Sequence, residues 1–250
     1  MDSAAAARIA RLAVSGEHAR VIEIGPGTGT LTRALLDCGA DVTAIEIDPD
    51  MVELLRQRDD LANVTLVQAD ALNFDYARFG AAGPWALTGN LPYNIATALI
   101  VNFVQMHNAP EALTVMVQKD VADRLGARPG TRAYGSLSII AQYAMEISGE
   151  FTLPPSVFFP KPKVHSAVVR LIRRTERAVR VTDEARFLQV VRGGFAYRRK
   201  TLANSLSLAL EIPRAAITTT LSELGYNTEI RGEQLAIGDF ARIGNALRSP

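Results

Sequence analysis

Hydrophobic and polar positions follow two alternating patterns up to Gln118. Short apolar runs, typical of buried strands, are each followed by a stretch in which apolar residues recur every three or four positions, as on one helix face. The predicted strands cover residues 20–24, 41–48 and 64–68, and a further apolar strand ends at Asn90. The apolar face of the helix after that strand is marked by Ile95, Leu99 and Phe103. This order predicts an α/β fold with a mostly parallel sheet.

The pattern changes in the last third of the chain. Only a proline-rich loop separates two late strands, at residues 144–151 and 166–173, which predicts an antiparallel pair at the edge of the sheet. Four helical stretches follow, at residues 183–191, 201–210, 213–224 and 237–247. We therefore predict an α/β domain over residues 1–177 and a small all-helical domain over residues 178–250.

A glycine-rich turn follows the first predicted strand. Gly25, Gly27 and Gly29 stand between that strand and a helical pattern that begins at Leu31. Glycines at this place let the backbone approach a nucleotide-like ligand at the carboxyl end of the strand. A dinucleotide fingerprint would need a glycine where Thr30 stands, and the chain has no Gly-Lys pair for a phosphate-binding loop. A nucleotide-like cofactor without a phosphate group fits this turn best.

Acidic residues end the next two predicted strands. Glu46 lies 21 residues after Gly25, the spacing at which a carboxylate meets a ribose, and both of its oxygens can accept from the diol. Asp70 follows the third strand, where a carboxylate can accept a hydrogen bond from an adenine amino group. A cap or turn role is the alternative for Asp70. In series, these strand ends line one crevice.

The strand that ends at Asn90 continues into Leu91, Pro92 and Tyr93. The Asn90 side-chain oxygen and a backbone carbonyl can accept the two N–H bonds of an exocyclic amine. Pro92 fixes φ and removes a competing donor, and Tyr93 offers an aromatic face. This arrangement suits transfer onto the exocyclic nitrogen of adenine, whose lone pair is delocalised into the ring. An ordinary turn is the alternative, since Asn and Pro are common in turns.

The glycine turn, the two acids and Asn-Leu-Pro-Tyr, in this order and spacing, resemble the class I S-adenosylmethionine-dependent methyltransferases. Methyl transfer is an in-line displacement that depends chiefly on proximity and orientation, so a metal or a nucleophilic triad is not expected. The three histidines are scattered and Cys38 stands alone. The resemblance implies a Rossmann-like sheet and a cofactor site made by Gly25, Gly27, Gly29, Glu46, Ile47, Asp70, Ala71 and Asn90.

Five further segments resemble the small-subunit ribosomal RNA adenine dimethyltransferases. They are residues 119–125, 129–135, 155–171, 195–206 and 231–235. In that family, two adjacent adenines near the 3′ end of 16S rRNA each receive two methyl groups at N6, late in subunit assembly. The resemblance implies that Asn90, Leu91, Pro92 and Tyr93 form the catalytic site and that Phe158 packs against the target base. Apolar cover at the edge of the sheet is the alternative for Phe158.

Charge is distributed unevenly along the chain. Residues 1–150 contain 11 Lys+Arg and 18 Asp+Glu, whereas residues 151–250 contain 16 and 8. The excess of positive charge in the second part is what a protein that binds a phosphate backbone is expected to have. The predicted partner is the small ribosomal subunit with its 16S rRNA, and a solvated charged surface is the alternative. The predicted RNA-binding residues are Arg198, Arg199, Lys200, Lys161 and Lys163.

Length and composition agree with this interpretation. A chain of 250 residues with 48% hydrophobic content can bury an α/β core and a second small domain. The single cysteine is typical of a reducing compartment, and no apolar run approaches the roughly 18 residues of a membrane span. Arg8 and Arg11 interrupt the only N-terminal apolar stretch. We expect a cytoplasmic monomer that does not associate with membranes.

Two other functions remain open from the sequence. A large-subunit rRNA adenine N6-methyltransferase of the antibiotic-resistance type shares the Asn-Leu/Ile-Pro-Tyr motif, although Tyr-Arg-Arg-Lys-Thr and Arg-Gly-Glu-Gln-Leu favour the small-subunit enzyme. A non-catalytic RNA-binding assembly or transcription factor on the same fold is the third possibility, against which the intact Asn90, Tyr93 and Glu46 argue. The family usually carries a Gly-Gln-Asn-Phe-Leu type segment before the helix that begins here at Asp2. We expect the lack of that segment to affect cofactor affinity.

Overall fold

The computed structural model describes residues 2–14, 20–92, 95–158 and 164–247. The chain divides into two compact units, which we call the sheet unit (residues 1–122 and 146–173) and the helical unit (residues 123–145 and 174–250). Residues 123–145 thus belong with the C-terminal helices. The sequence had instead suggested a single boundary after residue 177. The reason is long-range contact: the Tyr134 hydroxyl donates to the carbonyl of Leu235, 101 positions along the chain, at 2.9 Å.

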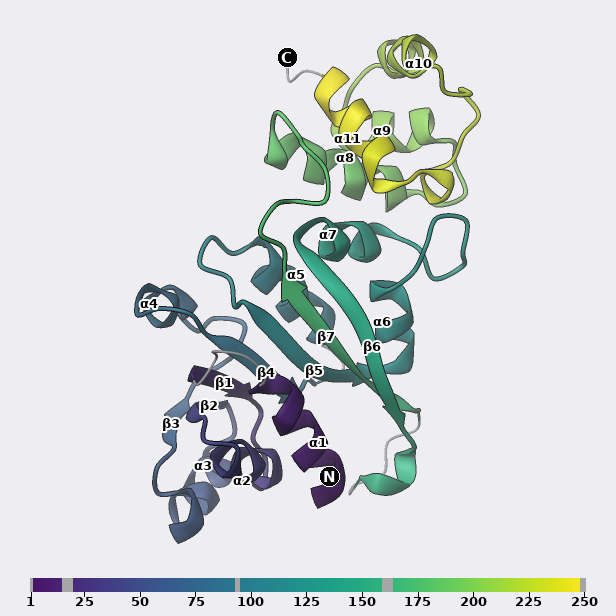
Figure 1. The fold of residues 1–250 in the computed structure, drawn as a ribbon. Coiled ribbons are helices and arrows are strands. Elements are labelled where there is room, and N and C mark those ends of the chain that lie inside the picture. Colours follow the sequence, from purple (N-terminus) through teal and green to yellow (C-terminus); the bar gives the residue numbers. More distant parts are fainter. Residues whose placement is uncertain (1, 15–19, 93–94, 159–163, 248–250) are drawn as a thin grey trace. The chain divides into compact units, whose positions relative to one another are not determined.

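The sheet unit is built on a seven-stranded sheet with the order β3-β2-β1-β4-β5-β7-β6 (Figure 1). The five strands from β3 to β5 pair in parallel, and β7 pairs antiparallel with β5. The expected mostly parallel sheet with two late strands at its edge is confirmed. The strands are β1 (Arg20–Ile24), β2 (Asp41–Glu46), β3 (Thr65–Gln68), β4 (Ala86–Asn90), β5 (Ala112–Gln118), β6 (Met145–Leu153) and β7 (Ser166–Arg173).

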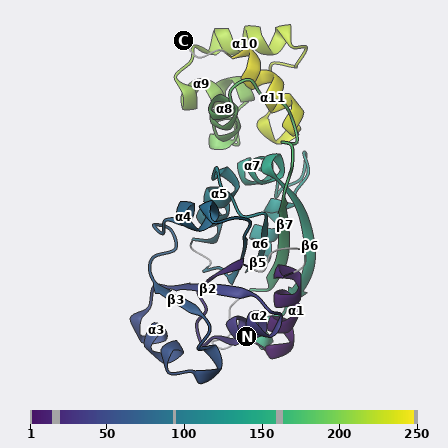
Figure 2. The same ribbon diagram turned by 60° about the vertical axis from the view of Figure 1, so that its left-hand side comes forward.

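Helices cover both faces of this sheet: α1, α2 and α3 lie on one face, and α4 and α5 on the other (Figures 1 and 2). Asp48 caps α3 by accepting from the Asp50 amide at 2.9 Å, with Pro49 at the first helical position. The helices and short 3₁₀ turns are α1 (Ser3–Ala13), α2 (Thr30–Asp37), α3 (Pro49–Arg56), η1 (Asp59–Leu61), α4 (Tyr76–Ala81), α5 (Ala96–Gln105), α6 (Lys119–Leu125) and η2 (Pro155–Val157).

One buried apolar cluster fastens the first helices to the sheet. It joins Ile9 of α1 and Leu35 of α2 to Val21 of β1 and Val42 of β2, all of them almost without solvent exposure. Alternating strand and helix patterns in the sequence predicted this packing, because each apolar run supplies one face of the layer. The strand ends that follow the cluster are therefore held in a fixed order along one edge of the sheet.

The helical unit contains the four helices expected from the sequence and a further one, α7. Asp183 caps α8 through the Arg186 amide at 3.0 Å, and Thr201 caps α9 through the Asn204 amide at 3.4 Å. Phe187 and Phe240 are fully buried in its core. The elements are α7 (Ser136–Ala144), α8 (Glu184–Ala196), α9 (Leu202–Leu210), α10 (Arg214–Glu223), η3 (Gly232–Gln234) and α11 (Ile237–Ala246). No helix in the described ranges is long and apolar enough to cross a membrane.

Candidate active site

The glycine turn adopts a backbone that ordinary side chains avoid. Gly25, Gly27 and Gly29 have φ values of +65°, +54° and +82°. The Gly25 amide donates to the carbonyl of Ile45 at 2.9 Å, which ties the start of the turn to β2. Nothing lies within 4 Å of the place where a Cβ of Gly27 would stand. The turn therefore leaves open space at the carboxyl end of β1, where a ligand can approach the main chain.

Glu46 connects the end of β2 to this turn. Its Oε1 accepts from the amides of Ile47 at 2.9 Å and Asp48 at 3.0 Å, and its Oε2 accepts from the Gly27 amide at 3.4 Å. A carboxylate oxygen offers about two acceptor positions, so Oε1 is already occupied. We expected both oxygens to accept from a ribose diol, but only Oε2 still has an acceptor position for a ribose hydroxyl.

Asp70 and Ala71 form a tight turn after β3. Asp70 accepts from the Leu72 amide at 2.9 Å and from the Asn73 side chain at 2.7 Å. The Ala71 carbonyl accepts from the Tyr76 hydroxyl at 2.8 Å. Burial, together with the charge of Asp70, raises the pKa of that hydroxyl and keeps it a donor. The turn role considered for Asp70 is observed, and an adenine contact stays a prediction.

Asn90 is brought to the glycine turn by a close approach of β4 to β1. A Cβ on Gly89 would stand 2.5 Å from the carbonyl oxygen of Ile24, so only glycine fits there. The carbonyl oxygen of the next residue, Asn90, lies 4.0 Å from where a Cβ of Gly25 would stand. Asn90 is exposed at this point. The two motifs that are 65 residues apart in the sequence thus meet at one edge of the sheet.

Leu91 and Pro92 carry the chain from β4 into α5. Leu91 is buried, and its amide donates to the carbonyl of Met116 at 3.0 Å. The Pro92 carbonyl accepts from the amides of Ile95 at 3.1 Å and Ala96 at 2.9 Å, which begins the helix. Tyr93 lies outside the described residues. These hydrogen bonds tie the main chain of Leu91 to β5 and that of Pro92 to the start of α5.

Phe158 is partly buried against the cluster of α1, α2, β1 and β2. Nearby, the Asp2 amide donates to the Val157 carbonyl at 3.1 Å, and the Arg8 guanidinium lies 3.8 Å from the centre of the Phe151 ring. Phe158 therefore covers apolar side chains, as in the alternative considered for it. Contact with a target base stays a prediction.

Glu23 is a site residue that the sequence interpretation missed. It lies on β1, two residues before the turn, and is 1% exposed. Its Oε2 is buried without a hydrogen-bond partner in the described part of the chain. Burial raises the pKa of the Glu23 carboxyl to about 7; the Thr32 side chain lowers this pKa, and the charge of Glu46 raises it. A lone acid inside the apolar run Arg20–Ile24 was the signal that could have identified it.

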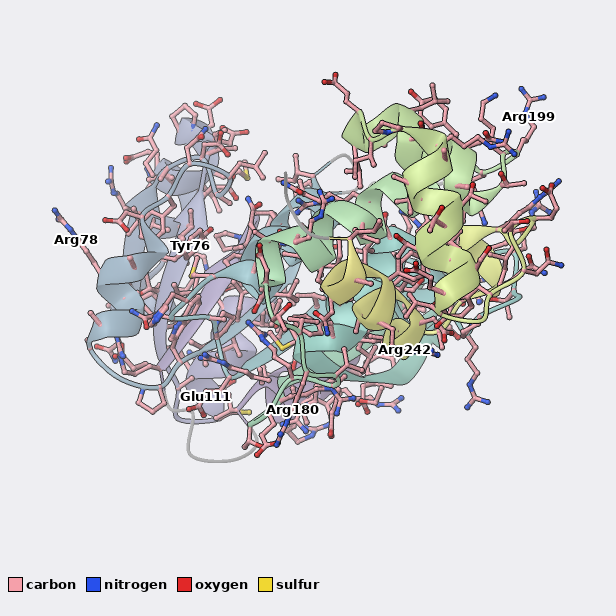
Figure 3. All side chains as sticks on the ribbon, turned by 90° about the horizontal axis from the view of Figure 1, so that it is seen from above. Tyr76, Arg78, Glu111, Arg180, Arg199 and Arg242 are labelled. Carbon is pink, nitrogen blue, oxygen red and sulfur yellow. The ribbon has the colours of Figure 1, made fainter. Side chains whose placement is uncertain are left out.

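The predicted basic residues divide into two kinds. Arg198 donates to the carbonyls of Arg132 and Tyr134, each at 3.1 Å, and lies 3.7 Å from Glu233. It therefore holds the loop before α7. Arg199 and Lys200 are exposed, and the Arg199 side chain extends away from the ribbon (Figure 3). Lys161 and Lys163 lie outside the described residues.

The charge asymmetry follows the two compact units. The sheet unit has 12 Lys+Arg and 17 Asp+Glu, a net charge of −5, and the helical unit has 15 and 9, a net charge of +6. The buried carboxylates Glu23 and Glu46 lie in the acidic unit, and the exposed Arg199 and Lys200 lie in the basic one. A cationic small molecule suits the first unit, and a phosphate backbone suits the second.

The sheet order, the glycine turn after β1 and the acid at the end of β2 define a class I S-adenosylmethionine-dependent methyltransferase. A family model described as ribosomal RNA adenine dimethylase matches residues 2–248, and the chain belongs to this family.

The relatives agree with this assignment. The chain is 41% identical over 248 residues to Ribosomal RNA small subunit methyltransferase A of Magnetococcus marinus, covering 98% of this chain and 88% of that protein. It is 39% identical over 247 residues to the protein of that name from Desulfitobacterium hafniense, covering 99% and 88%.

Two solved structures share the fold. A dimethyladenosine transferase from Plasmodium falciparum has a TM-score of 0.79 at 24% identity, covering 95% of this chain and 93% of that one. The 23S rRNA methyltransferase ErmE has a TM-score of 0.73 at 27% identity, covering 99% and 98%.

The residues present fit S-adenosylmethionine, which supplies the methyl group in this family. The open space at Gly27 admits a ligand next to the main chain, and Glu46 Oε2 remains to accept from a ribose hydroxyl. Ile47 beside it is 64% exposed, an apolar side chain available to cover a flat ring. The carboxylate of Glu46 at the end of β2 also suits a donor that carries a positive sulfonium.

Replacing Glu46 tests the ribose contact. Glu46→Gln keeps an oxygen for the Ile47 and Asp48 amides but places an NH₂ group where Oε2 accepts. We expect S-adenosylmethionine binding to weaken by about 1 to 3 kcal/mol in titration calorimetry, because a charge-assisted hydrogen bond is lost. Glu53→Gln on the exposed side of α3 is the matched control. Equal affinities in the two variants would remove Glu46 from the cofactor site.

Glu23 predicts a pH dependence of stability. Its ordinary pKa is 4.5 and the folded-state value is about 7. The protonated carboxyl therefore stabilises the folded state below pH 4.5, and this contribution is lost as the pH rises through 7. Between pH 5 and pH 8, we expect the free energy of unfolding to fall by about 1 to 3 kcal/mol more in the wild type than in Glu23→Gln.

Urea unfolding at a series of pH values measures this difference. Glu223→Gln, on the exposed surface of α10, serves as the control and should keep the wild-type pH dependence. If Glu23→Gln keeps it as well, the carboxyl of Glu23 does not titrate in this range.

Proposed function

We propose that this protein transfers methyl groups from S-adenosylmethionine to N6 of two adjacent adenines near the 3′ end of 16S rRNA, forming N6,N6-dimethyladenosines late in small-subunit assembly. The observation that carries this proposal is the identity of about 40% over nearly the whole chain with proteins named Ribosomal RNA small subunit methyltransferase A. The protein would act as a cytoplasmic monomer on the assembling subunit.

The geometry at the end of β4 supports chemistry at an exocyclic amine. The exposed Asn90 side-chain oxygen can accept one N–H bond of the target amine. The Pro92 carbonyl is already used by α5, whereas the Leu91 carbonyl accepts no hydrogen bond among the described residues, so we assign the second acceptor to Leu91. Holding both N–H bonds localises the nitrogen lone pair and directs it toward the methyl donor.

A large-subunit rRNA methyltransferase is the second candidate, supported by the similarity to the ErmE structure. Its identity to this chain, 27%, is lower than the 39–41% of the small-subunit relatives. Two segments of the helical unit favour the small-subunit enzyme, and they contain Arg198 and Glu233. Arg198 Nη2 lies 3.7 Å from Glu233 Oε2, which brings these segments together. These features support the small-subunit assignment.

Mapping the methylated nucleotides tests the proposal directly. The protein is incubated with isotope-labelled S-adenosylmethionine and either unmethylated small subunits or unmethylated large subunits. We expect label in two adjacent adenines near the 3′ end of 16S rRNA. Label confined to large-subunit rRNA would indicate the resistance-type enzyme, and binding to small subunits without transfer would indicate a non-catalytic assembly factor.

Asn90→Ala tests the catalytic assignment. Because the contact with the amine matters mainly in the transition state, we expect turnover to fall by about two orders of magnitude or more. Binding of RNA and of S-adenosylmethionine should remain close to that of the wild type. Single-turnover kinetics and calorimetry measure the two effects separately. A variant with normal turnover and poor cofactor binding would place Asn90 in the cofactor pocket alone.

The exposed cations of the helical unit test RNA binding. Replacing Arg199 and Lys200 together by Ala should reduce the slope of log affinity against log salt by about two, since each phosphate contact releases roughly one counterion. Filter binding to small subunits at several salt concentrations measures the slope. The control is Arg214→Ala, which removes an exposed cation at the start of α10. An unaltered slope in the double variant would mean that these cations are only solvated.

A further inference from the structure

Arg58 contacts the glycine turn from α3 and η1. It lies between the end of α3 and the start of η1, and its Nη1 donates to the carbonyl oxygen of Thr28 at 2.6 Å. The amide of Gly29, on the other side of the same peptide bond, donates to the Pro26 carbonyl at 2.9 Å. Both polar atoms of the Thr28–Gly29 peptide are therefore held. This peptide sets the left-handed conformation of Gly29, where α2 begins.

Arg58 is itself oriented by an ion pair. Its Nε and Nη2 donate to the two carboxylate oxygens of Asp60 at 2.9 Å and 2.5 Å, the two-pronged geometry that gives Arg–carboxylate pairs their directionality. The main-chain carbonyl of Asp60 accepts from Arg33 Nη1 at 3.4 Å, and Arg33 also pairs with Asp37 of α2. The Arg58 guanidinium thus connects Asp60 of η1 to the Thr28 carbonyl, and Arg33 connects Asp60 to α2.

Apolar packing at Gly29 is tight but does not fill the space around Arg58. A Cβ on Gly29 would stand 2.7 Å from Leu61 Cδ1 and 2.9 Å from Leu55 Cδ2. Beside these side chains lies a cavity of about 210 Å³, lined in part by Thr32, Leu61 and Arg58 itself. No residue of the glycine turn lines this cavity, so the packing next to the turn comes from Leu55 and Leu61. The hydrogen bond from Arg58 to the Thr28 carbonyl adds a directional contact to those made by the amides of the three glycines.

We propose that Arg58 is a positioning residue for the methyl donor: it holds the glycine turn in the conformation that receives S-adenosylmethionine. Holding the turn before binding reduces the conformational entropy lost on binding. Arg58 acts through the Thr28–Gly29 peptide, because its hydrogen bond to the turn is made to the carbonyl oxygen of that peptide. This inference rests on the proposed function in that it takes the ligand of the turn to be the methyl donor.

Arg58→Met tests this role, because methionine keeps an unbranched apolar stem and removes every donor. Calorimetry with S-adenosylmethionine, well below the unfolding temperature, should show a Kd about 5 to 30 times higher than in the wild type, as expected for the loss of one charge-assisted hydrogen bond. Arg58→Lys, which keeps a cationic donor, should recover part of the affinity. The matched control is Arg56→Met, an exposed arginine two residues away on α3, which should bind like the wild type.

Amide hydrogen exchange and steady-state kinetics separate positioning from general stability. In Arg58→Met without ligand, the Gly29 amide should exchange faster than in Arg56→Met, and KM for the donor should rise while kcat stays near the wild-type value. A lower unfolding temperature with an unchanged Kd and unchanged Gly29 exchange would overturn the inference. Failure of the wild type itself to bind S-adenosylmethionine would instead count against the proposed function.

Discussion

The close approach of β4 to the end of β1 is the constraint on which the site depends. Gly89 passes so near to the Ile24 carbonyl that a Cβ would stand 2.5 Å from it, which excludes any other residue. The approach sets the Asn90 carbonyl next to Gly25, and at Gly27 in the same turn the space beside the main chain is open. The proposed acceptor for the amine and the proposed site for the methyl donor thus share one sheet edge, and such proximity is what an in-line displacement needs.

Hydrogen bonds between separate elements connect this edge. Glu46 joins β2 to the Gly27 amide, and Arg58 joins the end of α3 to the Thr28 carbonyl. Glu23 is different, because its buried carboxyl has no hydrogen bond to Oε2 in the described residues and its pKa is raised by that burial. Keeping such a group charged in the core costs free energy, which is why its protonated form is favoured.

The helical unit uses arginine for structure as well as for charge. Arg198 is exposed but donates to carbonyls of the loop before α7, and Arg199 and Lys200 beside it are exposed as well. Tyr134 joins the same loop to Leu235, and burial raises the pKa of its hydroxyl to about 12, so that it remains a donor. Three separate segments of the sequence are thereby combined into one basic unit.

The sequence by itself determined the order of strands and helices, the glycine turn, the acid at Glu46 and the Asn-Leu-Pro end of β4, because these follow from local periodicity and short spacings. Only the tertiary structure decided the burial of Glu23 and the contacts of Arg58 and Arg198. Burial of Glu23 depends on neighbouring strands, and the contacts of Arg58 and Arg198 join residues 30 and 64 to 66 positions apart. No local pattern encodes such contacts, since they arise when distant elements pack together.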